Sequence, residues 1–370
     1  MRKLASIQEI LRLDPIPDAD RIEKATILGW EVVVKKGEFN VGDKCIYCEI
    51  DSVMPDWPVF EFLRNKKFRI KTQKLRGIYS QGICFPLSLI REINPSSKEL
   101  SKFKIDDDVS EILKITKYDP FEEEEEEITK KSGFFYRIDK FLWKYGFKKN
   151  KRKKKDSDQF PIHLCPKTDE TRCQSLSSAI ICRSGNNAYI TEKLDGSSTT
   201  YIMHITKNWF GKKKYNFYPC SRNLVRRGSK AEKQDKVLLI AQRLDIENKL
   251  KKLRRNIAVQ GECVGQGLNG NLYKMEDFEF RTFLMWDIDK KQYLPLDEFL
   301  DIANKLGLET VPILEKEHKI FEDPKKYVEM STGKSKINPK IFREGIVVRM
   351  HNENFSFKSV SPEYLLKYDK

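Results

Sequence analysis

The chain has 370 residues, of which 39% are apolar and 34% are charged, and its formal net charge is +15. The apolar content can build packed cores and excludes global disorder, and the length favours two domains because single cores rarely grow past roughly 250 residues. The positive charge favours nucleic acid as partner over an anionic membrane or a heparin-like surface. No signal-peptide core and no apolar run of transmembrane length occurs, which predicts a soluble intracellular protein.

The eight cysteines are scattered along the chain, which is typical of reduced thiols in strands and loops and not of a disulfide framework. Cys45 and Cys48 have the spacing of a zinc-binding pair, but they lie in the apolar run CIYCEI and no second pair follows. We therefore predict no zinc site. The four histidines are also far apart in the sequence, which argues against a metal or acid–base site built on histidine.

Residues 1–120 contain short β-type runs such as GWEVVVKKG and GICFPL, broken by glycine and proline, and this spacing predicts a small barrel or sandwich. The segment 62–77, FLRNKKFRIKTQKLRG, interleaves basic side chains with Phe62 and Phe68. It is either a solvated basic hairpin or a basic groove with aromatic faces that tracks a nucleic-acid backbone. Its basic residues are Arg64, Lys66, Lys67, Arg69, Lys71, Lys74 and Arg76.

Residues 121–159 form a charged linker by composition. Six consecutive glutamates at 122–127 precede a segment, 129–155, with twelve Lys or Arg and one Asp. Aromatic and aliphatic residues recur near helical spacing in this segment, so it is either a solvated spacer or a basic amphipathic helix that binds RNA or packs on a domain. The run KKNKRKKK at 148–155 also matches a nuclear import signal, which leaves both cytoplasm and nucleus open.

From residue 160 onward the pattern changes to alternating strands and helices. The segment 231–256 places five aliphatic residues on one stripe and predicts an amphipathic packing helix, and 296–307 predicts another that ends at Gly307. The sequence 265–270 matches G-x-G-x-x-G, but no convincing helix or βαβ unit follows, so we predict no dinucleotide site there.

The segment 188–205, AYITEKLDGSSTTYIMHI, has β-type flanks around Lys193, Asp195 and Gly196. In a continuous strand, a lysine and a carboxylate two residues apart would point to the same face. Alone this pattern fits a solvated strand with a surface ion pair. Its value comes from the segments that follow it in order: Ser221-Arg222-Asn223, Glu262 in AVQGECVG, Trp286 and Asp287 in FLMWDI, Glu344 in REGIVVR, and Lys358 in FSFKS.

This ordered set resembles the motifs of the covalent nucleotidyltransferase superfamily, which comprises polynucleotide ligases and RNA capping enzymes. The chain is most similar to nick-sealing RNA ligases with an N-terminal OB domain, the type found in an amoebal ligase. The likeness extends upstream to FPIHLCPKTDETRCQ at 160–174 and into the first domain. It implies an α+β chain with an OB-type β-barrel at 1–120, the linker at 121–159, and at 160–370 a nucleotidyltransferase domain of antiparallel sheets flanked by helices.

The resemblance also implies the residues of the catalytic and metal sites. Lys193 would be the nucleophile that becomes lysyl-AMP. Asp195 and Glu344 would hold Mg²⁺, for which Mn²⁺ would substitute, through its water ligands, with Asp287 as a third carboxylate. Twelve residues follow Lys358, which leaves no room for the C-terminal OB domain that orients pyrophosphate in DNA ligases and capping enzymes.

The nucleotide-binding residues are implied in the same way. Glu262 and Arg222 would bind ribose and phosphate, and Lys358 would contact the α-phosphate. Glu192, Lys167 and Arg172 would position the nucleotide, and Trp286, or Phe283 if the register differs, would stack on adenine.

The implied reaction is ATP-dependent RNA ligation. AMP would join Lys193, move to an RNA 5′-phosphate, and leave when a 3′-hydroxyl attacks, most simply at a nick in duplex RNA. No membrane and no obligate protein partner is implied. A capping guanylyltransferase, a DNA ligase and an RNA-binding protein with an inert nucleotidyltransferase fold stay open as alternatives.

The chemistry of the lysine sets a further expectation. An attacking amine must be uncharged, whereas a free lysine has a pKa of about 10.4. We expect Lys358, Arg222 and Mg²⁺ to lower the pKa of Lys193, because nearby positive charge favours the neutral amine. In FSFKS, alternation places Ser356 and Lys358 on one face of a strand and Phe355 and Phe357 on the other.

Overall fold

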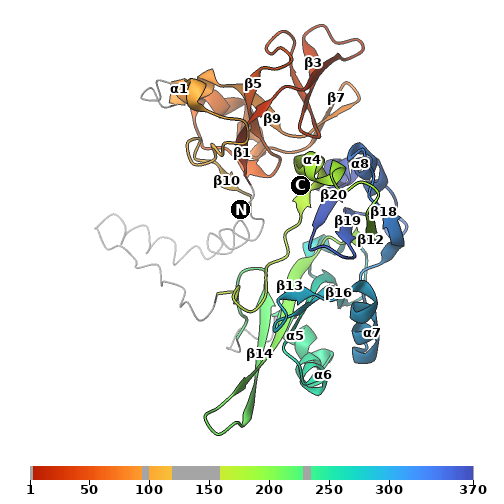
Figure 1. Cartoon of the computed structure of the whole chain (residues 1–370). Helices are drawn as coiled ribbons and strands as arrows, with labels where there is room; N and C mark the ends of the chain where they lie inside the picture. Colours follow the sequence, from red (N-terminus) through yellow and green to blue (C-terminus); the bar gives the residue numbers. More distant parts are fainter. Residues whose placement is uncertain (1–2, 94–99, 119–158, 228–234, 370) are drawn as a thin grey trace, which may run out of the picture. The chain divides into compact units, whose positions relative to one another are not determined.

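The computed structural model describes residues 3–93, 100–118, 159–227 and 235–369, and the chain divides into two compact units, residues 1–154 and 155–370 (Figure 1). The linker that we predict over 121–159, with its basic helix and the run 148–155, lies outside the described residues except for its last position. None of the described helices is both long and apolar enough to cross a membrane.

The first unit consists of short, mostly antiparallel strands around a core that includes Trp30, Tyr47 and Phe60. Strands β1, β5 and β9 form one sheet and β2, β3 and β4 a second, and two further pairs, β7–β8 and β6–β10, complete it. The described strands form these separate small sheets and not one closed barrel, a minor departure from the prediction. The elements are β1 Ala5–Glu9, β2 Arg12–Pro15, β3 Ile22–Ile27, β4 Trp30–Lys35, β5 Lys44–Cys48, β6 Ser52–Val53, η1 Pro58–Lys66, β7 Gln73–Leu75, β8 Ile78–Ser80, β9 Ile83–Pro86, α1 Ser88–Ile93, η2 Leu100–Lys102 and β10 Thr116–Lys117.

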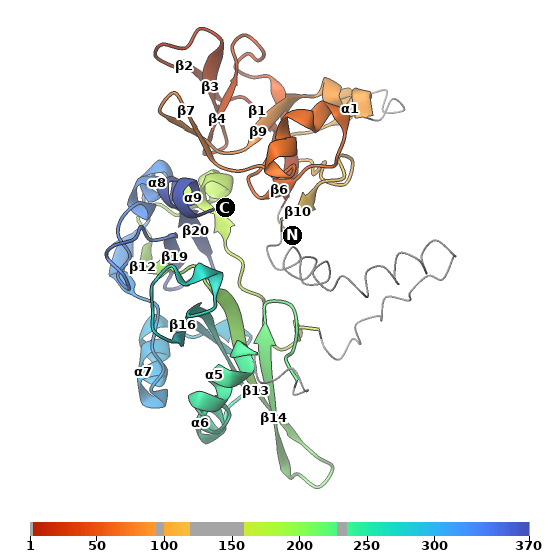
Figure 2. The same ribbon diagram turned by 180° about the vertical axis from the view of Figure 1, so that it is seen from behind.

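The second unit contains two five-stranded sheets (Figure 2). The β12 sheet has the order β11-β20-β19-β12-β18, and the β13 sheet has the order β14-β13-β15-β16-β17. Its elements are β11 Thr171–Arg172, η4 Cys173–Leu176, α4 Ser177–Ile181, β12 Asn187–Lys193, β13 Ser197–Lys207, β14 Lys213–Ser221, α5 Lys236–Arg243, α6 Ile246–Leu253, β15 Ile257–Gly265, η6 Asn269–Asn271, β16 Phe278–Asp287, β17 Gln292–Tyr293, α7 Leu296–Leu306, β18 Ile313–Lys319, α8 Lys325–Ser331, β19 Gly345–Met350, β20 Ser356–Val360 and α9 Pro362–Tyr368.

The segment 188–205 is therefore not one strand. Lys193 ends β12 in the first of these sheets, and Ser197 begins β13 in the other. Asp195 and Gly196 lie in the three-residue connection by which the chain passes from one sheet to the next. The K-x-D-G pattern marks this passage between the sheets. Because Asp195 lies outside both strands, strand alternation does not determine the direction of its side chain.

Each sheet is covered by helices on an apolar core. Helices α5, α6 and α7 pack on the β13 sheet around residues such as Tyr201, Ile240 and Phe299. Helix α8 and the α4 region pack on the β12 sheet around Ile190, Tyr327 and Phe357. Phe357 is fully buried while the adjacent Lys358 is partly exposed, which confirms the alternation predicted for FSFKS.

The helix predicted over 231–256 is two helices. Asp235 caps α5 by accepting hydrogen bonds from two backbone N–H groups, and Asp245, in the left-handed region at φ 48°, separates α5 from α6. Because the chain turns there, the apolar stripe continues onto α6, where Leu250 is fully buried. The helix predicted over 296–307 is confirmed as α7, and Gly307 follows it at φ 58°.

Tyr327 allows a test of the core of the β12 sheet. Its buried hydroxyl accepts a hydrogen bond from the backbone N–H of Phe321 at 2.9 Å and contacts Nε2 of His318 at 3.2 Å. Tyr327→Phe would leave these buried groups unpaired, and we expect it to lower the free energy of unfolding by about 1–3 kcal/mol. Urea denaturation measures the change, and Tyr215→Phe, at a partly exposed tyrosine of β14, is the control. Equal stability of the two variants would contradict the expectation.

Candidate active site

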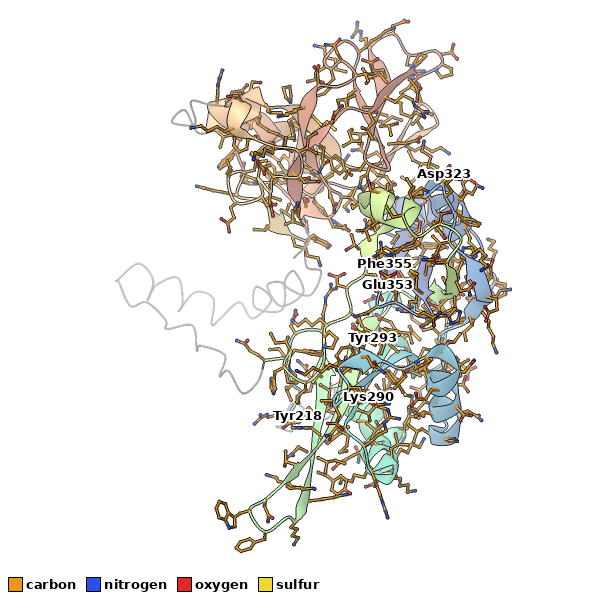
Figure 3. The ribbon with its side chains drawn as sticks, viewed as in Figure 1. Tyr218, Lys290, Tyr293, Asp323, Glu353 and Phe355 are labelled. Atoms are coloured by element: carbon orange, nitrogen blue, oxygen red, sulfur yellow. The ribbon has the colours of Figure 1, made fainter. Side chains whose placement is uncertain are left out.

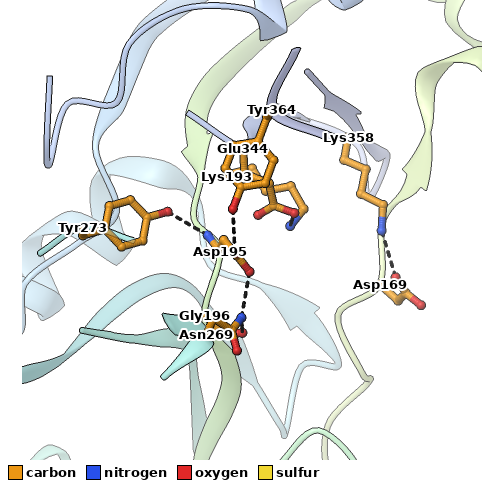
Figure 4. A network of polar contacts seen from close by, with 9 residues as sticks. All are labelled: Asp169, Lys193, Asp195, Gly196, Asn269, Tyr273, Glu344, Lys358 and Tyr364. Atoms are coloured by element: carbon orange, nitrogen blue, oxygen red, sulfur yellow. Dashed lines mark hydrogen bonds and ion pairs between the residues drawn. The ribbon is translucent and has the colours of Figure 1, made fainter. Parts of the chain in front are cut away.

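Lys193 is held by an ion pair between neighbouring strands. Its Nζ donates a hydrogen bond to Oε1 of Glu344 at 2.6 Å (Figure 4). The pairing of β12 with β19 sets Lys193 opposite Gly345, so the residue before β19, Glu344, reaches the lysine from the adjacent strand. The two residues are 151 positions apart in sequence, and the strand register brings them together.

Gly196 allows the connection between the two sheets to run close to β15. A Cβ at this position would lie 2.3 Å from the carbonyl oxygen of Cys263 and 2.8 Å from Cγ of Glu262, both on β15. Both distances are shorter than any real Cβ contact, so only glycine fits without a shift of the backbone. The glycine is required here for space, and its effect is to place β15, with Glu262, beside the connection that carries Asp195.

Three side chains that the sequence analysis does not single out hold Asp195 in place. Asn269 donates to its Oδ1 at 2.7 Å, and the hydroxyl of Tyr364 donates to its Oδ2 at 2.5 Å. Its backbone N–H donates to the hydroxyl of Tyr273 at 2.8 Å. Asn269 belongs to the G-x-G-x-x-G segment, to which the sequence analysis assigns no function. Nothing in the sequence connects Tyr273 or Tyr364 to Asp195.

The charges around Lys193 are predominantly negative. Burial would lower the pKa of Lys193, but Glu344, Glu262 and Asp195 together raise it above its ordinary value. Burial, together with Glu344 and Asp195, raises the pKa of Glu262 to about 8 despite the opposing effect of Lys193. The expectation of a lowered lysine pKa is therefore wrong for the protein without ligands, because carboxylates dominate the surroundings of the amine.

These carboxylates fit a hydrated divalent cation. Oε2 of Glu344 is buried and has no hydrogen-bond partner among the described residues. Three carboxylates, Asp195, Glu262 and Glu344, face one lysine charge, so a cation would restore the balance. In the described part of the chain, no three His, Cys, Asp or Glu side chains lie close enough to hold a metal directly. Mg²⁺ commonly keeps several of its waters and binds through one or two carboxylates, which suits this arrangement.

A second group of charges, which we call the cation cluster, consists of Lys167, Arg172, Arg222 and Lys358 around Asp169. Lys358 donates to Oδ1 of Asp169 at 3.0 Å, and Arg222 contacts Oδ2 at 2.9 Å. Lys167 donates to the side chain of Asn223 at 2.9 Å, and Arg172 lies opposite Lys358 in the pairing of β11 with β20. The cluster thus places two cations on one carboxylate and two more beside them, an excess of positive charge that suits an anion.

The cation cluster and the carboxylates around Lys193 are neighbours. Arg222 lowers the pKa of Glu262, and Lys193 contributes to lowering the pKa of Lys358. Burial is the largest influence on Lys358 and brings its pKa to about 8. Influences of this kind require that the groups lie close together. The two sets of charges therefore belong to one site.

Three predicted residues lie elsewhere. Asp287 pairs with Ile257, five positions along β15 from Glu262 and so roughly 17 Å away at about 3.3 Å per residue, and it binds Arg255 at 2.6 Å. It is therefore not placed to hold a metal with Asp195. Trp286 packs edge-to-face on Tyr293, labelled in Figure 3, with ring centroids 4.9 Å apart.

Glu192 also points away from Lys193, because the two are consecutive residues of β12. Its Oε2 accepts a hydrogen bond from the backbone N–H of Lys336 at 2.7 Å, so its side chain holds the segment before β19. Burial raises the pKa of Glu192 above its ordinary value. We find no contact between the carboxylate of Glu192 and the cation cluster within the described residues.

Phe283, the alternative aromatic residue, lies at an irregularity of β16. The pairing of β15 with β16 slips by one residue, so that Leu284 faces Gln260, Thr282 faces Gly261, and Phe283 is left over as a bulge. The guanidinium of Arg349 lies 5.5 Å from the ring centroid of Phe283. This is the alternative register that the sequence left open for the aromatic residue.

Arg349 and Glu170 form a buried pair that sequence reasoning missed. Arg349 donates to Oε1 of Glu170 at 2.6 Å and to the hydroxyl of Thr191 at 3.2 Å. The pair ties the segment 167–172 to β19 and β12. It thereby fixes Asp169, which precedes Glu170, at the centre of the cation cluster. The only hint in the sequence was that both residues lie in quoted motifs, KTDETR and REGIVVR.

In the first unit, the basic segment 62–77 is partly engaged. Arg69 is buried, donates to Asp51 at 2.7 Å and lies over the ring of Tyr118. Arg64 is bound by Asp56 and Glu61. Arg69 is therefore not available to a ligand, whereas Arg64 stays exposed. The other exposed basic residues of the segment are Lys67, Lys74 and Arg76, and the aromatic Phe62 is exposed beside them.

Comparison with known families follows this division of the chain. A family model for RNA ligase matches residues 186–368, and one for an OB-fold domain matches residues 4–87. The second match confirms the OB-type character of the first unit. A search of curated proteins gives no significant match.

Solved structures of Naegleria gruberi RNA ligase are similar over the full length. A mutant of that ligase with ATP and Mn is 30% identical with a TM-score of 0.78, and the match covers 99% of each chain. A mutant with AMP and Mn is 30% identical with a TM-score of 0.79, and the match covers 100% of this chain and 99% of the other.

The structure of the same ligase with pyrophosphate is also 30% identical, with a TM-score of 0.78 and coverage of 100% of this chain and 99% of the other. These matches confirm the resemblance inferred from the ordered motifs and the α+β fold. They extend through both units, and with the family match over 186–368 they show that this chain belongs to the RNA ligase family.

Proposed function

We propose that this RNA ligase uses ATP and a divalent cation to join RNA ends through a covalent lysyl-AMP on Lys193. The position of the Lys193 amine carries the proposal: it lies 2.6 Å from Glu344, among three carboxylates and beside four clustered cations. The Naegleria relatives bound to ATP, AMP, pyrophosphate and Mn support the same nucleotide and metal.

In the first step the Lys193 amine attacks the α-phosphorus of ATP. An N–P bond forms, the bond to pyrophosphate breaks, and the amine must first give up a proton, for which Oε1 of Glu344 is an acceptor at 2.6 Å. Asp195, Glu262 and Glu344 would hold the divalent cation through its waters. When bound, it would supply positive charge that offsets these carboxylates, lowers the pKa of Lys193 and neutralises the α-phosphate.

The cation cluster would receive the phosphates. Lys358 and Arg222 share Asp169 in the protein without ligands, and a nucleotide phosphate offers them a stronger acceptor than an exposed carboxylate. Phe283, backed by Arg349, would stack on adenine. Little covalent chemistry is then left to the protein, which positions the reacting groups and neutralises charge.

The remaining steps act on RNA. AMP moves from Lys193 to an RNA 5′-phosphate, and a 3′-hydroxyl then attacks that phosphate and releases AMP. We propose a nick in duplex RNA as the substrate, because pairing to a continuous strand aligns the two ends, and the formal net charge of +15 suits a duplex. No protein partner is needed for these steps.

Labelling with α-³²P-ATP tests the proposal. We expect Mg²⁺-dependent label on denatured protein that Lys193→Ala abolishes, and subsequent sealing of a nicked RNA duplex. Lys305→Ala, at an exposed lysine paired with Asp301, is the control and should label normally. Label from GTP alone would indicate a capping enzyme, and sealing of DNA nicks alone a DNA ligase. A folded protein without label from either nucleotide would contradict the proposal.

The pKa of Lys358 predicts how AMP binding depends on pH. With a pKa of about 8, its amine is charged below pH 8 and neutral above it, and a bound phosphate favours the charged form. AMP affinity should therefore be steady from pH 6.5 to about 8 and fall by up to about tenfold per unit above it. Lys358→Arg, whose charge does not titrate, should flatten the fall.

Equilibrium dialysis of AMP across this pH range measures the effect. AMP suits this purpose because it cannot adenylylate the lysine. An equally steep fall in Lys358→Arg would assign the titration to another group, such as Glu262, whose pKa is also about 8.

Tyr364 should matter for the rate of adenylylation. Its hydroxyl is one of the two side-chain donors to Asp195, and a hydrogen bond to a charged group contributes about 1.5–3 kcal/mol. Tyr364→Phe should therefore slow lysyl-AMP formation roughly 10- to 100-fold when it is assayed well below the melting temperature of the variant. Tyr368→Phe, on the same helix, is the control. A normal rate in Tyr364→Phe would show that Asn269 alone suffices to hold Asp195.

A further inference from the structure

The tip of the hairpin formed by β13 and β14 displays two aromatic rings to solvent. Trp209 is 96% exposed and Phe210 is 89% exposed, more than any other large apolar residue in the described part of the chain. Folding normally removes such surface from water. Neither residue belongs to the site around Lys193, so their exposure calls for a different explanation.

The two strands carry this tip beyond the rest of the β13 sheet. Strand β15 pairs with β13 only as far as Met203, and from His204 onward β13 pairs with β14 alone. Figure 1 shows the ribbon extending past the other strands of this unit, and in Figure 3 the side chains at its end stand in open space. The two rings at the tip thus have almost no packing against the described residues of their own unit.

The tip is nevertheless well ordered by hydrogen bonds. The side-chain oxygen of Asn208 accepts from the backbone N–H groups of Phe210 at 3.1 Å and Lys212 at 2.8 Å. The N–H of Gly211, which has φ 73°, donates to the carbonyl of Asn208 at 2.9 Å. The turn therefore holds the two rings in position before a partner binds. Binding then costs little conformational entropy at the tip.

The ribbon is also strongly basic at the same end. Lysines 207, 212, 213 and 214 are all exposed, no acidic residue lies between 206 and 214, and none of these lysines has an ion pair within the described residues. Lys207 lies directly opposite Lys213 in the strand pairing. Like charges directly opposite each other destabilise a hairpin. The lysines therefore do not stabilise the fold, which indicates that they bind a ligand.

We propose that this tip is a second RNA contact, at which Trp209 and Phe210 stack on bases and the four lysines bind phosphates. Aromatic rings on a basic ribbon supply the two attractions that nucleic acid offers, a π-face and a charged backbone. The inference rests on the proposed function, since it takes the partner to be the RNA that is joined. An anionic membrane would attract the same lysines and is the alternative that the test must separate.

The ribbon also sets the place of contact on the RNA. Strand β13 starts directly after Gly196 and runs for ten residue steps to Lys207, about 33 Å at roughly 3.3 Å per residue. With roughly 3.4 Å per nucleotide along a stacked strand, this corresponds to on the order of ten nucleotides from the join. The tip would thus require RNA well beyond the ends that react.

The test compares Trp209→Ala/Phe210→Ala with the native chain on nicked RNA duplexes. We expect about 10- to 100-fold weaker binding and a matching loss of kcat/KM when both arms have about 20 base pairs, and no difference when both have about six. Lysyl-AMP formation from ATP alone should be unchanged. The swap Trp209→Phe/Phe210→Trp should retain the affinity, and Ile181→Ala, at an exposed apolar residue of α4, is the matched control.

The lysines give a second readout. Lys213→Ser should reduce the slope of log Kd against log salt by about one, whereas Lys305→Ser, at the paired lysine of α7, should leave it unchanged. In addition, RNA should protect Trp209 from acrylamide quenching, and this protected component should be missing in Trp209→Phe.

Three outcomes would overturn the proposal: equal affinity of native and doubly substituted chains for the long duplex, an equal loss on long and short duplexes, or a loss confined to binding of phosphatidylserine vesicles. Failure of the proposed function can be distinguished from failure of this proposal. In that case the native chain would form no lysyl-AMP and would seal no RNA. Binding of RNA by native and substituted chains still tests the hairpin in that case.

Discussion

The ion pair between Lys193 and Glu344 lies among further acidic side chains. The lysine alone does not balance them. Asp195 and Glu262 lie beside the pair, so three acidic side chains surround one amine, and one oxygen of Glu344 is buried without a hydrogen-bond partner among the described residues. These groups together raise the pKa of Lys193, so the amine is held in its charged form. In the proposed mechanism, positive charge brought in with the nucleotide would favour the neutral amine instead.

The fold supports this arrangement through the boundary between two sheets. The chain passes from β12 to β13 within three residues, and Gly196 allows β15 to approach at a distance that no side chain would permit. Lys193 therefore lies on the β12 sheet, and Glu262 lies on the β13 sheet. A rigid core under each sheet holds the two parts, and the hydrogen bonds of Asp195 to Asn269 and Tyr364 bind the connection itself.

In the cation cluster, by contrast, positive side chains outnumber the carboxylate that lies between them. Asp169 lies between Lys358 and Arg222, so these cations are kept in position and partly neutralised. The buried pair of Arg349 and Glu170 anchors the segment that carries Asp169. In the proposed function, a phosphate would replace the carboxylate of Asp169 as the partner of these cations.

The sequence by itself determined the order of the motifs, the family to which they belong, and local elements such as α7 with its terminal glycine and the alternation of FSFKS. Those features depend on neighbours in the chain. Only the tertiary structure decided which residues meet Asp195, that Asp287 lies at the far end of its strand, and that a bulge turns Phe283 toward Arg349. It also showed that Arg69 is buried and that the predicted long helix is broken at Asp245. The reason is that strand register and sheet-to-sheet packing join residues more than a hundred positions apart, and no local pattern encodes such distances.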